Sequence, residues 1–436
     1  MSEEKLVPKL RFPSYSSEWH SYTLGEILTF YSTNSFSREK LNYDTGSVKN
    51  IHYGDIHTKF PSIVSVSDNK DIPFINNEID LSKYSEDQYL QNGDLIIADA
   101  SEDYEDIGKA IEVKNIDDEK VLAGLHTILA RDNNNITVNG FKAYLFSTNS
   151  LKTKIKIIAN GISVLGISKN SLSKLTVNVP SKNEQNDVVD FISLIDNKIE
   201  LLEQKHQYYL DFKKFLMQQI FTQKLRFADS DSCWKEISLK DIGTFYRGHS
   251  YNSTNVADEG LLVLRSNNIQ GNVLDFSEDG LQFVDKDCKK ELELQKNDIV
   301  ICMSNGTRRL VGKSAEYTGN YENKVTVGAF CSIFRTKNKL AKYLFQTESY
   351  KKNLYLILAG TNINNLKNSD LEKFKFNIPT NESEINKIHD LFVSIDNKID
   401  YNKKQLEEIT LFKKGLLQQM FVVQLILSLL QNKKHI

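Results

Sequence analysis

The two halves of the 436-residue chain repeat each other, and this repeat limits the possible fold more than any other feature. Matching segments follow in the same order, at offsets that shrink from 215 to about 200 residues. The matches pair Leu10-Arg11-Phe12 with Leu225-Arg226-Phe227, Ile107-Gly108-Lys109-Ala110 with Val311-Gly312-Lys313-Ser314, Tyr144-Leu145-Phe146 with Tyr343-Leu344-Phe345, and Ile195-Asp196-Asn197-Lys198-Ile199 with an identical copy at 395–399. Loop insertions between equivalent elements produce such drift. The pattern therefore predicts one module, duplicated and diverged, with pseudo-twofold symmetry.

Each half begins with a globular part, predicted at residues 1–182 and 222–382. Short apolar runs bounded by Asn, Gly, Asp and Ser are typical of strands. Such runs occur at Leu95–Ala98, Leu261–Leu264, Ile299–Cys302 and Phe374–Ile378. Strands and helices do not alternate regularly, so we expect an α+β fold rather than a doubly wound sheet.

Each half continues into a long helix, predicted at residues 183–221 and 383–421. Apolar residues recur there at alternating spacings of four and three, which favours a coiled coil. The core positions are Val188, Ile192, Ile195, Ile199 and Leu202 in the first helix and Ile388, Phe392, Ile395, Ile399 and Leu406 in the second. His206, Asn402, Lys213 and Lys413 interrupt this pattern, as residues that fix register or face a partner do.

The lengths of the connections predict that the two helices pair antiparallel. The second globular part begins near Leu225, directly after the first helix ends near Phe221. Parallel helices would require this part to bridge a helix of about 55 to 60 Å. The apolar tail at 422–436 has no counterpart in the repeat, and we expect it to pack beside the N-terminal segment or to be a translation-frame artefact.

Composition favours a globular cytoplasmic protein. The chain is 40% hydrophobic and 26% charged, with no signal peptide or apolar run long enough for a membrane span. Cys233, Cys288, Cys302 and Cys331 lack the spacing of a zinc site or a disulfide framework, so we expect free thiols and no metal. Because the net charge is −2, any binding to DNA must depend on local basic patches or on a partner.

The sequence offers no convincing catalytic site. The six prolines include no adjacent pair, which the motif of an amino-methyltransferase requires. The segment from Gly306 to Ser314 resembles a phosphate-binding loop but has one residue too many between its glycines. Glu112-Val113-Lys114 matches a nuclease Glu-x-Lys, a pattern common by chance. We therefore expect no catalytic residues.

The doubled order of these segments resembles the specificity (S) subunit of type I restriction-modification systems. The segments that carry the resemblance are Pro8 to Pro13 before Trp19, Ile51 to Ile56, Leu264 to Ile269, and the two Ile-Asp-Asn-Lys-Ile copies. The resemblance implies two target-recognition domains, each reading one half of a bipartite, asymmetric DNA site. It implies that the helices set the spacing of the halves and dock two methyltransferase subunits, to which restriction-translocase subunits are added.

The resemblance also implies that S-adenosylmethionine, ATP and Mg²⁺ are bound by the partner subunits and not by this chain. The alternatives are a free-standing nuclease or methyltransferase, and a coiled-coil scaffold without affinity for DNA.

Candidate DNA contacts are the side chains that suit bases or phosphates and lie in equivalent loops. In the second half these are Arg247, Arg265, Asn267, Asn268, Arg308, Arg309 and Asn362, and in the first half Arg38, Lys40, Tyr53, His57 and Lys59. His52 and Arg265 occupy matching places yet differ, which suits two different half-sites.

Overall fold

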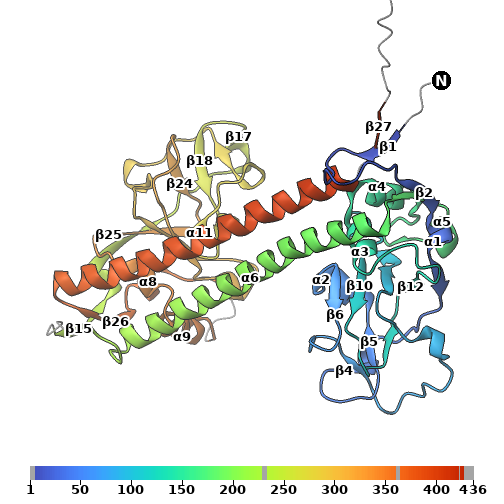
Figure 1. Cartoon of the computed structure of the whole chain (residues 1–436). Coiled ribbons are helices and arrows are strands. Elements are labelled where there is room, and N and C mark those ends of the chain that lie inside the picture. The colour runs from blue at the N-terminus through green and yellow to red at the C-terminus, as the bar shows by residue number, and fades with distance from the viewer. Residues whose placement is uncertain (1–4, 228–232, 360–363, 422, 427–436) are drawn as a thin grey trace, which may run out of the picture. The chain divides into compact units, whose positions relative to one another are not determined.

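The computed structural model describes the chain apart from residues 1–4, 228–232, 360–363, 422 and 427–436 (Figure 1). The chain divides into two compact units. Unit 1 comprises Met1–Glu203 and Gln405–Ile436, and unit 2 comprises Gln204–Lys404. Each unit combines helices with mainly antiparallel sheets, as predicted for an α+β fold.

Unit 1 is built on a five-stranded sheet of order β3-β12-β8-β10-β6 and a four-stranded sheet of order β11-β5-β7-β4. Its central strand β8 is buried along its whole length and contributes to the cores on both of its faces. The elements are β1 (Lys5–Pro8), β2 (His20–Thr23), α1 (Leu24–Ile27), β3 (Thr29–Tyr31), η1 (Arg38–Lys40), β4 (Leu41–Asn42), β5 (Lys49–Ile51), α2 (Tyr53–Thr58), β6 (Ile63–Ser65), β7 (Phe74–Ile75), η2 (Glu86–Gln88), β8 (Leu95–Ala98), β9 (Ala100–Ser101), β10 (Ala110–Lys114), β11 (Val121–Ala123), β12 (Thr127–Arg131), α3 (Phe141–Ser147), α4 (Asn149–Ile158), β13 (Leu165–Gly166), α5 (Lys169–Ser173), β14 (Thr176–Val179) and β27 (Val423–Ile426).

Unit 2 contains two four-stranded sheets, of order β16-β25-β22-β23 and β17-β21-β18-β24. Equivalent strands occur in the same order in unit 1, where β3-β12-β8-β10 and β4-β7-β5-β11 correspond. The elements are β15 (Trp234–Ser238), α7 (Leu239–Ile242), β16 (Gly243–Arg247), η3 (Ser253–Asn255), β17 (Val256–Ala257), β18 (Leu261–Leu264), η4 (Ser266–Asn268), β19 (Ile269–Gln270), β20 (Val273–Leu274), η5 (Glu278–Gly280), β21 (Phe283–Val284), η6 (Lys290–Leu292), β22 (Ile299–Cys302), η7 (Arg308–Leu310), β23 (Ser314–Glu316), β24 (Val325–Val327), β25 (Cys331–Thr336), α8 (Ala341–Leu344), α9 (Glu348–Ala359), α10 (Asn368–Leu371) and β26 (Lys375–Pro379).

Two helices of 40 residues each, α6 (Lys182–Phe221) and α11 (Glu382–Phe421), contribute one half to each unit. In unit 1, Asp196 of α6 forms an ion pair with Lys413 of α11. In unit 2, Lys213 Nζ lies 2.7 Å from Asp396 Oδ1, and the ring of Phe221 stacks on Phe392. Within each unit, residues early in one helix contact residues late in the other. The helix halves of each unit therefore pack antiparallel.

A buried glutamate fixes the first turn of each long helix. Glu184 Oε1 accepts hydrogen bonds from Arg11 Nε at 2.7 Å and from Trp19 Nε1 at 3.2 Å. Glu384 accepts from Arg226 and from Trp234 Nε1, the latter at 3.2 Å. The repeated Leu-Arg-Phe and Trp motifs thus supply donors that hold the start of a helix against the preceding chain. Acidic groups also suit a helix N-terminus.

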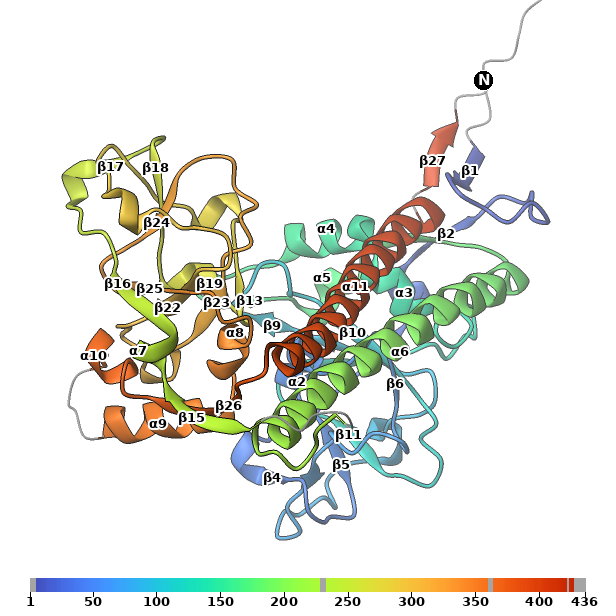
Figure 2. The ribbon, with the colours of Figure 1, turned by 90° about the vertical axis from the view of Figure 1, so that its left-hand side faces the viewer.

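The two ends of the described chain lie side by side. Strand β27 pairs antiparallel with β1, with Lys5 opposite Ile426 and Pro8 opposite Val423 (Figure 2). The described part of the tail therefore packs beside the N-terminal segment, which is one of the two outcomes that its sequence suggested.

Replacing Asn50 with valine should stabilise unit 1. Asn50 lies in β5 with no exposed surface, and neither amide atom has a hydrogen-bond partner. A buried polar group without a partner costs about 1 to 3 kcal/mol. We expect Asn50→Val to raise the free energy of unfolding, measured by urea denaturation, by about 1 kcal/mol or more.

Asn34→Val is the matched control, because the buried Asn34 donates to Ala123 O at 2.9 Å and accepts from Phe36 N at 3.1 Å. This control should be destabilising. A loss of stability in Asn50→Val as well would show that the amide of Asn50 is satisfied in solution.

Candidate nucleic-acid interface

In unit 1, four of the five candidate residues gather around the short helix α2. His52 caps this helix, because its Nδ1 accepts a hydrogen bond from Gly54 N at 3.1 Å. The ring of Tyr53 lies 5.8 Å from that of His57 and 5.3 Å from that of His126. This arrangement presents a cluster of aromatic and imidazole rings at one surface of the unit.

A buried carboxylate holds the two cations of this cluster. Asp55 is fully buried, and its Oδ2 lies 2.7 Å from Arg38 Nη1. Its Oδ1 lies 3.2 Å from Lys59 Nζ, which also donates to Tyr43 Oη at 2.9 Å. The hydrogen bond to Asp55 raises the pKa of Arg38 above its ordinary value. Both side chains remain more than 40% exposed, so each can reach a phosphate.

Lys40 lies apart from this cluster and packs over the ring of Phe36 at 5.5 Å. The structure therefore brings together Arg38, Tyr53, His57 and Lys59 but not Lys40. Sequence reasoning missed Asp55 as the residue that positions the two cations, although it lies within the segment Ile51 to Ile56.

In unit 2, Arg265 precedes the turn η4, at the place that His52 has before α2. Arg265 N donates to Asn268 Oδ1 at 2.9 Å, while Asn268 Nδ2 donates to the carbonyls of Asp275 and Gly280. Asn268 is 2% exposed, so its position suits holding the turn rather than direct contact with a ligand. Asn267 is exposed beside it and donates only a long hydrogen bond, from Nδ2 to Gly280 O at 3.4 Å, so its position suits contact with a ligand better.

Arg308 and Arg309 are exposed on η7, in a loop that hydrogen bonds tie to the turn η4. Asn305 Nδ2 donates to Ser266 Oγ at 3.0 Å, and Asn364 Nδ2 donates to Gly306 O at 3.1 Å. Three positioning residues, Ser266, Asn305 and Asn364, escaped sequence reasoning. Their only signal is a local abundance of Asn and Ser. Arg247 is exposed at the end of β16, and the candidate Asn362 lies outside the described residues.

The glycine-lysine motif of each unit supports these loops. Lys109 Nζ donates to His57 O at 2.6 Å, and Lys313 Nζ donates to Ile269 O at 2.8 Å. Gly108 and Gly312 have φ values of +73° and +84°, which side chains other than glycine rarely adopt. The motif thus forms a structural turn whose lysine holds the neighbouring loop.

Glu112, from the nuclease-like motif, also has a structural role, because its carboxylate is buried and fully occupied by contacts within unit 1. It is 1% exposed, lies 3.0 Å from Lys142 Nζ and accepts hydrogen bonds from Gly140 N and Ala143 N. Burial raises its pKa. Among the described residues, no group of three or more His, Cys, Asp or Glu is arranged to hold a metal ion. Nor is any described helix long and apolar enough to cross a membrane.

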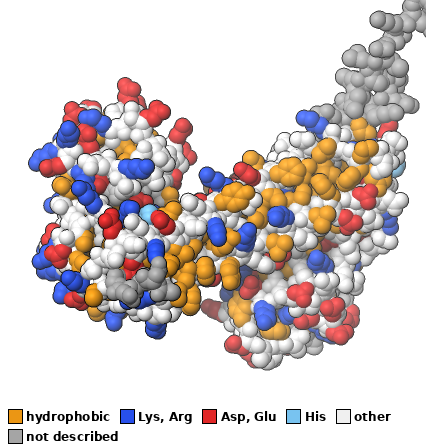
Figure 3. All heavy atoms as spheres, turned by 60° about the vertical axis from the view of Figure 1, so that its left-hand side comes forward, with side chains coloured by type: hydrophobic (Ala, Val, Ile, Leu, Met, Phe, Trp, Pro, Cys, Tyr) orange, Lys and Arg blue, Asp and Glu red, His pale blue; other side chains and the backbone are white. Residues whose placement is uncertain are grey.

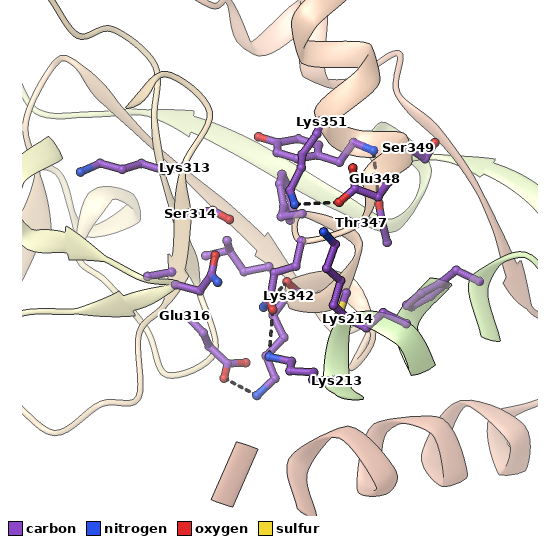
Figure 4. A pocket seen from close by; sticks show the side chains of 18 of the residues that line it. Lys213, Lys214, Lys313, Ser314, Glu316, Lys342, Thr347, Glu348, Ser349 and Lys351 are labelled. Atoms are coloured by element: carbon purple, nitrogen blue, oxygen red, sulfur yellow. Dashed lines mark hydrogen bonds and ion pairs between the residues drawn. The ribbon is translucent and has the colours of Figure 1, made fainter. Parts of the chain in front are cut away.

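A groove of about 1090 Å³ in unit 2 is lined by residues of α6, α11, α9 and β23 (Figure 4). Most of its charged side chains are paired: Lys342 lies 2.9 Å from Glu316, and Lys351 lies 2.9 Å from Glu348 (Figure 4). Lys213 also pairs with Asp396 there. Because most of its charged side chains are paired with each other, the groove is poorly suited to bind a charged substrate. Its ion pairs instead hold the surrounding helices and strand together.

The family model for the type I restriction modification DNA specificity domain matches residues 16–208 and 231–411 of the chain. The chain therefore belongs to this family. It is 29% identical to the StySPI specificity subunit of Salmonella potsdam over 185 residues, covering 40% of this chain and 39% of that protein. It is 30% identical to the EcoKI specificity subunit of Escherichia coli (strain K12) over 155 residues, covering 34% of this chain and 32% of that protein.

The alignments thus span less than half the length of these two relatives. The crystal structure of the S subunit from the type I restriction-modification system of M. genitalium has a similar fold. That likeness has a TM-score of 0.57 at 15% identity and covers 96% of this chain and 99% of that one.

Acidification should destabilise unit 1 through His52. Burial, followed by the charge of Arg38, lowers the pKa of His52 from 6.5 to about 4. The unfolded chain takes up a proton near pH 6.5, whereas folded His52 resists it, because protonated Nδ1 cannot accept from Gly54 N. The contribution of neutral His52 to the free energy of unfolding is therefore fully present above pH 6.5 and is lost as the pH falls toward 4.

At pH 5 the loss amounts to about 2 kcal/mol. The measurement is the free energy of unfolding of the native chain and of His52→Asn at pH 7.5 and pH 5, since asparagine also caps helices but does not titrate. The native chain should lose more stability than this variant. The exposed His20, changed to Asn, provides the control. Equal losses in all three proteins would contradict the assignment.

Proposed function

We propose that this chain is the non-catalytic specificity subunit of a type I restriction-modification complex, in which each unit reads one half of a bipartite, asymmetric DNA site. The observation that carries the proposal is a shared scaffold with unlike loops. Arg131 pairs with Asp94 at 2.7 Å in unit 1, and Arg335 pairs with Asp298 at 2.7 Å in unit 2. The loops that follow the equivalent strands β8 and β22 differ in charge.

This combination suits recognition of two different sequences. A rigid scaffold places loops at a groove, and the side chains on those loops select bases or grip phosphates. In unit 2 the exposed arginines 308 and 309 and Asn267 have the chemistry for guanine, adenine and phosphate. In unit 1 the corresponding surface presents Arg38, Lys59 and the rings around Tyr53. Because the two units present different side chains to DNA, the two half-sites should differ in sequence.

We infer that α6 and α11 form an antiparallel coiled coil that spaces the two readers and docks partner subunits. The antiparallel packing of the helix halves within each unit supports this pairing. Large apolar side chains are exposed on both helices: Leu194, Leu201, Tyr208, Phe212, Phe215, Tyr401, Leu411 and Phe412. Figure 3 shows hydrophobic side chains on the open surface of the helical part. Exposed apolar stripes of this kind mark protein-protein contacts.

The partners that the family relationship suggests are two methyltransferase subunits and the restriction-translocase subunits that join them. Their docking would cover the apolar helix surface and would supply the net positive charge that this chain, with a net charge of −2, lacks. We place S-adenosylmethionine, ATP and Mg²⁺ on those subunits. In this assignment, this chain contributes sequence recognition and geometry but no step of chemistry.

The mutations Arg308→Ala and Arg309→Ala should impair recognition of one half-site and leave the other unchanged. Both side chains are exposed on the loop that Asn305 ties to the turn η4 of unit 2. Loss of a base or phosphate contact costs about 1 to 3 kcal/mol, or roughly 5- to 150-fold in affinity. The measurement is adenine methylation by the complex on duplexes in which either half-site has been scrambled.

Arg226→Lys controls for arginines with a structural role, since Arg226 binds Glu384 in the same unit. Equal losses at both half-sites would mean general phosphate attraction or unfolding. Incubation of the chain alone with DNA and S-adenosylmethionine completes the experiment. Turnover without the methyltransferase subunits would contradict the non-catalytic assignment.

Lengthening both helices by one turn should lengthen the tolerated gap between the half-sites. Four residues inserted after Lys198 and four after Thr410, which face each other in the antiparallel register set by Asp196 and Lys413, keep the apolar face aligned. The insertion adds about 6 Å, or about two base pairs of DNA. Methylation of sites with altered gaps measures the shift. An unchanged preferred gap would refute the spacer function.

A further inference from the structure

The candidate interface of unit 2 contains an exposed aromatic side chain that its charge and amide pattern does not reveal. Phe330 lies in the turn between β24 and β25 and is 70% exposed. A single exposed apolar residue needs no explanation by itself. What distinguishes Phe330 is its position among the loops that carry the candidate DNA contacts.

The turn of Phe330 is hydrogen-bonded to two of these loops. Gly328 N donates to Leu264 O at 2.9 Å, directly before the turn η4 with its candidate arginine and asparagines. On the other side, Phe330 O accepts hydrogen bonds from Met303 N at 2.8 Å and from Ser304 N at 3.2 Å. The loop to η7 and its two arginines begins there. Phe330 therefore lies between the two loops.

A third segment adjoins the same turn. Gly248 N donates to Cys331 O at 3.0 Å, which holds the end of β16 and its exposed Arg247 against the turn. The described candidate contacts of unit 2 thus come from three loops that meet at Phe330. Any duplex that these loops grip together must pass close to the phenyl ring.

The equivalent position in unit 1 holds a different residue in the same backbone frame. Asp99 N donates to His126 O at 3.1 Å, which is the bond that the carbonyl of Phe330 receives in unit 2. His126 is also exposed, and its ring packs edge-on against Tyr53 in the ring cluster at α2. The fold therefore presents one exposed ring at this position in each unit, and the ring differs in chemistry between the two.

The chemistry of a phenyl ring limits what it can recognise on DNA. It has no hydrogen-bond donor or acceptor for a phosphate, a sugar or a polar base edge. In the major groove, the apolar group at the base edges is the C5 methyl of thymine, and phenylalanine suits contact with it. The neighbouring arginines and Asn267 suit guanine, phosphate and adenine instead.

We propose that Phe330 recognises a thymine through its C5 methyl group in the half-site that unit 2 reads. The inference rests on the proposed function, because it requires that unit 2 reads bases in the major groove. Contact between the ring and the methyl group removes apolar surface of both from water, which favours thymine over cytosine at that position. The imidazole of His126 can hydrogen-bond to a base edge, so unit 1 reads its half-site differently at this place.

The test uses the full chain assembled with its methyltransferase subunits and a duplex that contains the complete site. Each thymine of both half-sites is replaced in turn by deoxyuridine, which pairs with adenine as thymine does and lacks only the methyl group. The dissociation constant of each duplex is measured with the native chain, Phe330→Ala and Phe330→Leu. Tyr355→Ala is the matched control, because Tyr355 is an aromatic residue of unit 2 that is 72% exposed on α9.

We expect one deoxyuridine, in the half-site that Arg308→Ala impairs, to weaken binding by the native chain about 3- to 10-fold, as loss of one buried methyl group does. Phe330→Ala should bind the unmodified duplex more weakly by a similar factor and should no longer respond to that deoxyuridine. Phe330→Leu should keep part of the response, because leucine still offers apolar contact. Tyr355→Ala should respond as the native chain does.

Two results would overturn the proposal. Equal sensitivity of the native chain and Phe330→Ala to every deoxyuridine would show that the ring contacts no thymine methyl group. Weaker binding by Phe330→Ala, with no effect of deoxyuridine on the native chain, would mean another kind of contact, such as insertion of the ring between base pairs. Failure of the proposed function looks different, because the native complex would then bind the site no more tightly than unrelated DNA.

Discussion

The structure depends most on an ion pair between the two long helices, which occurs once in each unit. In unit 2, Asp396 pairs with Lys213 at 2.7 Å and accepts a hydrogen bond from Tyr343 Oη at 3.1 Å. The same lysine lies over the ring of Tyr343. Asp196, Lys413 and Tyr144 form the equivalent group in unit 1. One cluster thus joins α6, α11 and a helix of the globular part, and partial burial strengthens its electrostatics.

This cluster explains why the identical segment of the repeat has the residues it has. The aspartate of Ile-Asp-Asn-Lys-Ile meets the lysine of the opposite helix, while its isoleucines face the apolar seam.

The sequence predicted the strands Leu95–Ala98, Leu261–Leu264 and Ile299–Cys302 with the bounds that the structure has. Their edges were readable because apolar runs end there at turn residues. The long helices begin earlier than the apolar pattern, at Lys182 and Glu382, because polar first turns carry no periodicity.

The candidate site was less predictable, since its loops are held by contacts that composition does not reveal. Sequence reasoning selected Arg38 and Lys59 by charge but could not foresee that one buried carboxylate, Asp55, holds both. It selected Asn268 as a base reader, although burial commits this side chain to backbone carbonyls. A side chain that contacts DNA can be distinguished from one that holds a loop only when the hydrogen bonds that each polar atom makes within the fold are known.

The two copies of the module carry opposite charge on one pair of equivalent loops. A net charge of −2 suggests a poor ligand for DNA, but this average hides a loop with two arginines in unit 2 and a loop with four carboxylates in unit 1. On a shared scaffold, such opposite loops cannot serve one purpose, because phosphates attract the first and repel the second. The loop of unit 2 can therefore contribute phosphate contacts that the equivalent loop of unit 1 cannot, and the exposed cations beside α2 of unit 1 are Arg38 and Lys59 instead.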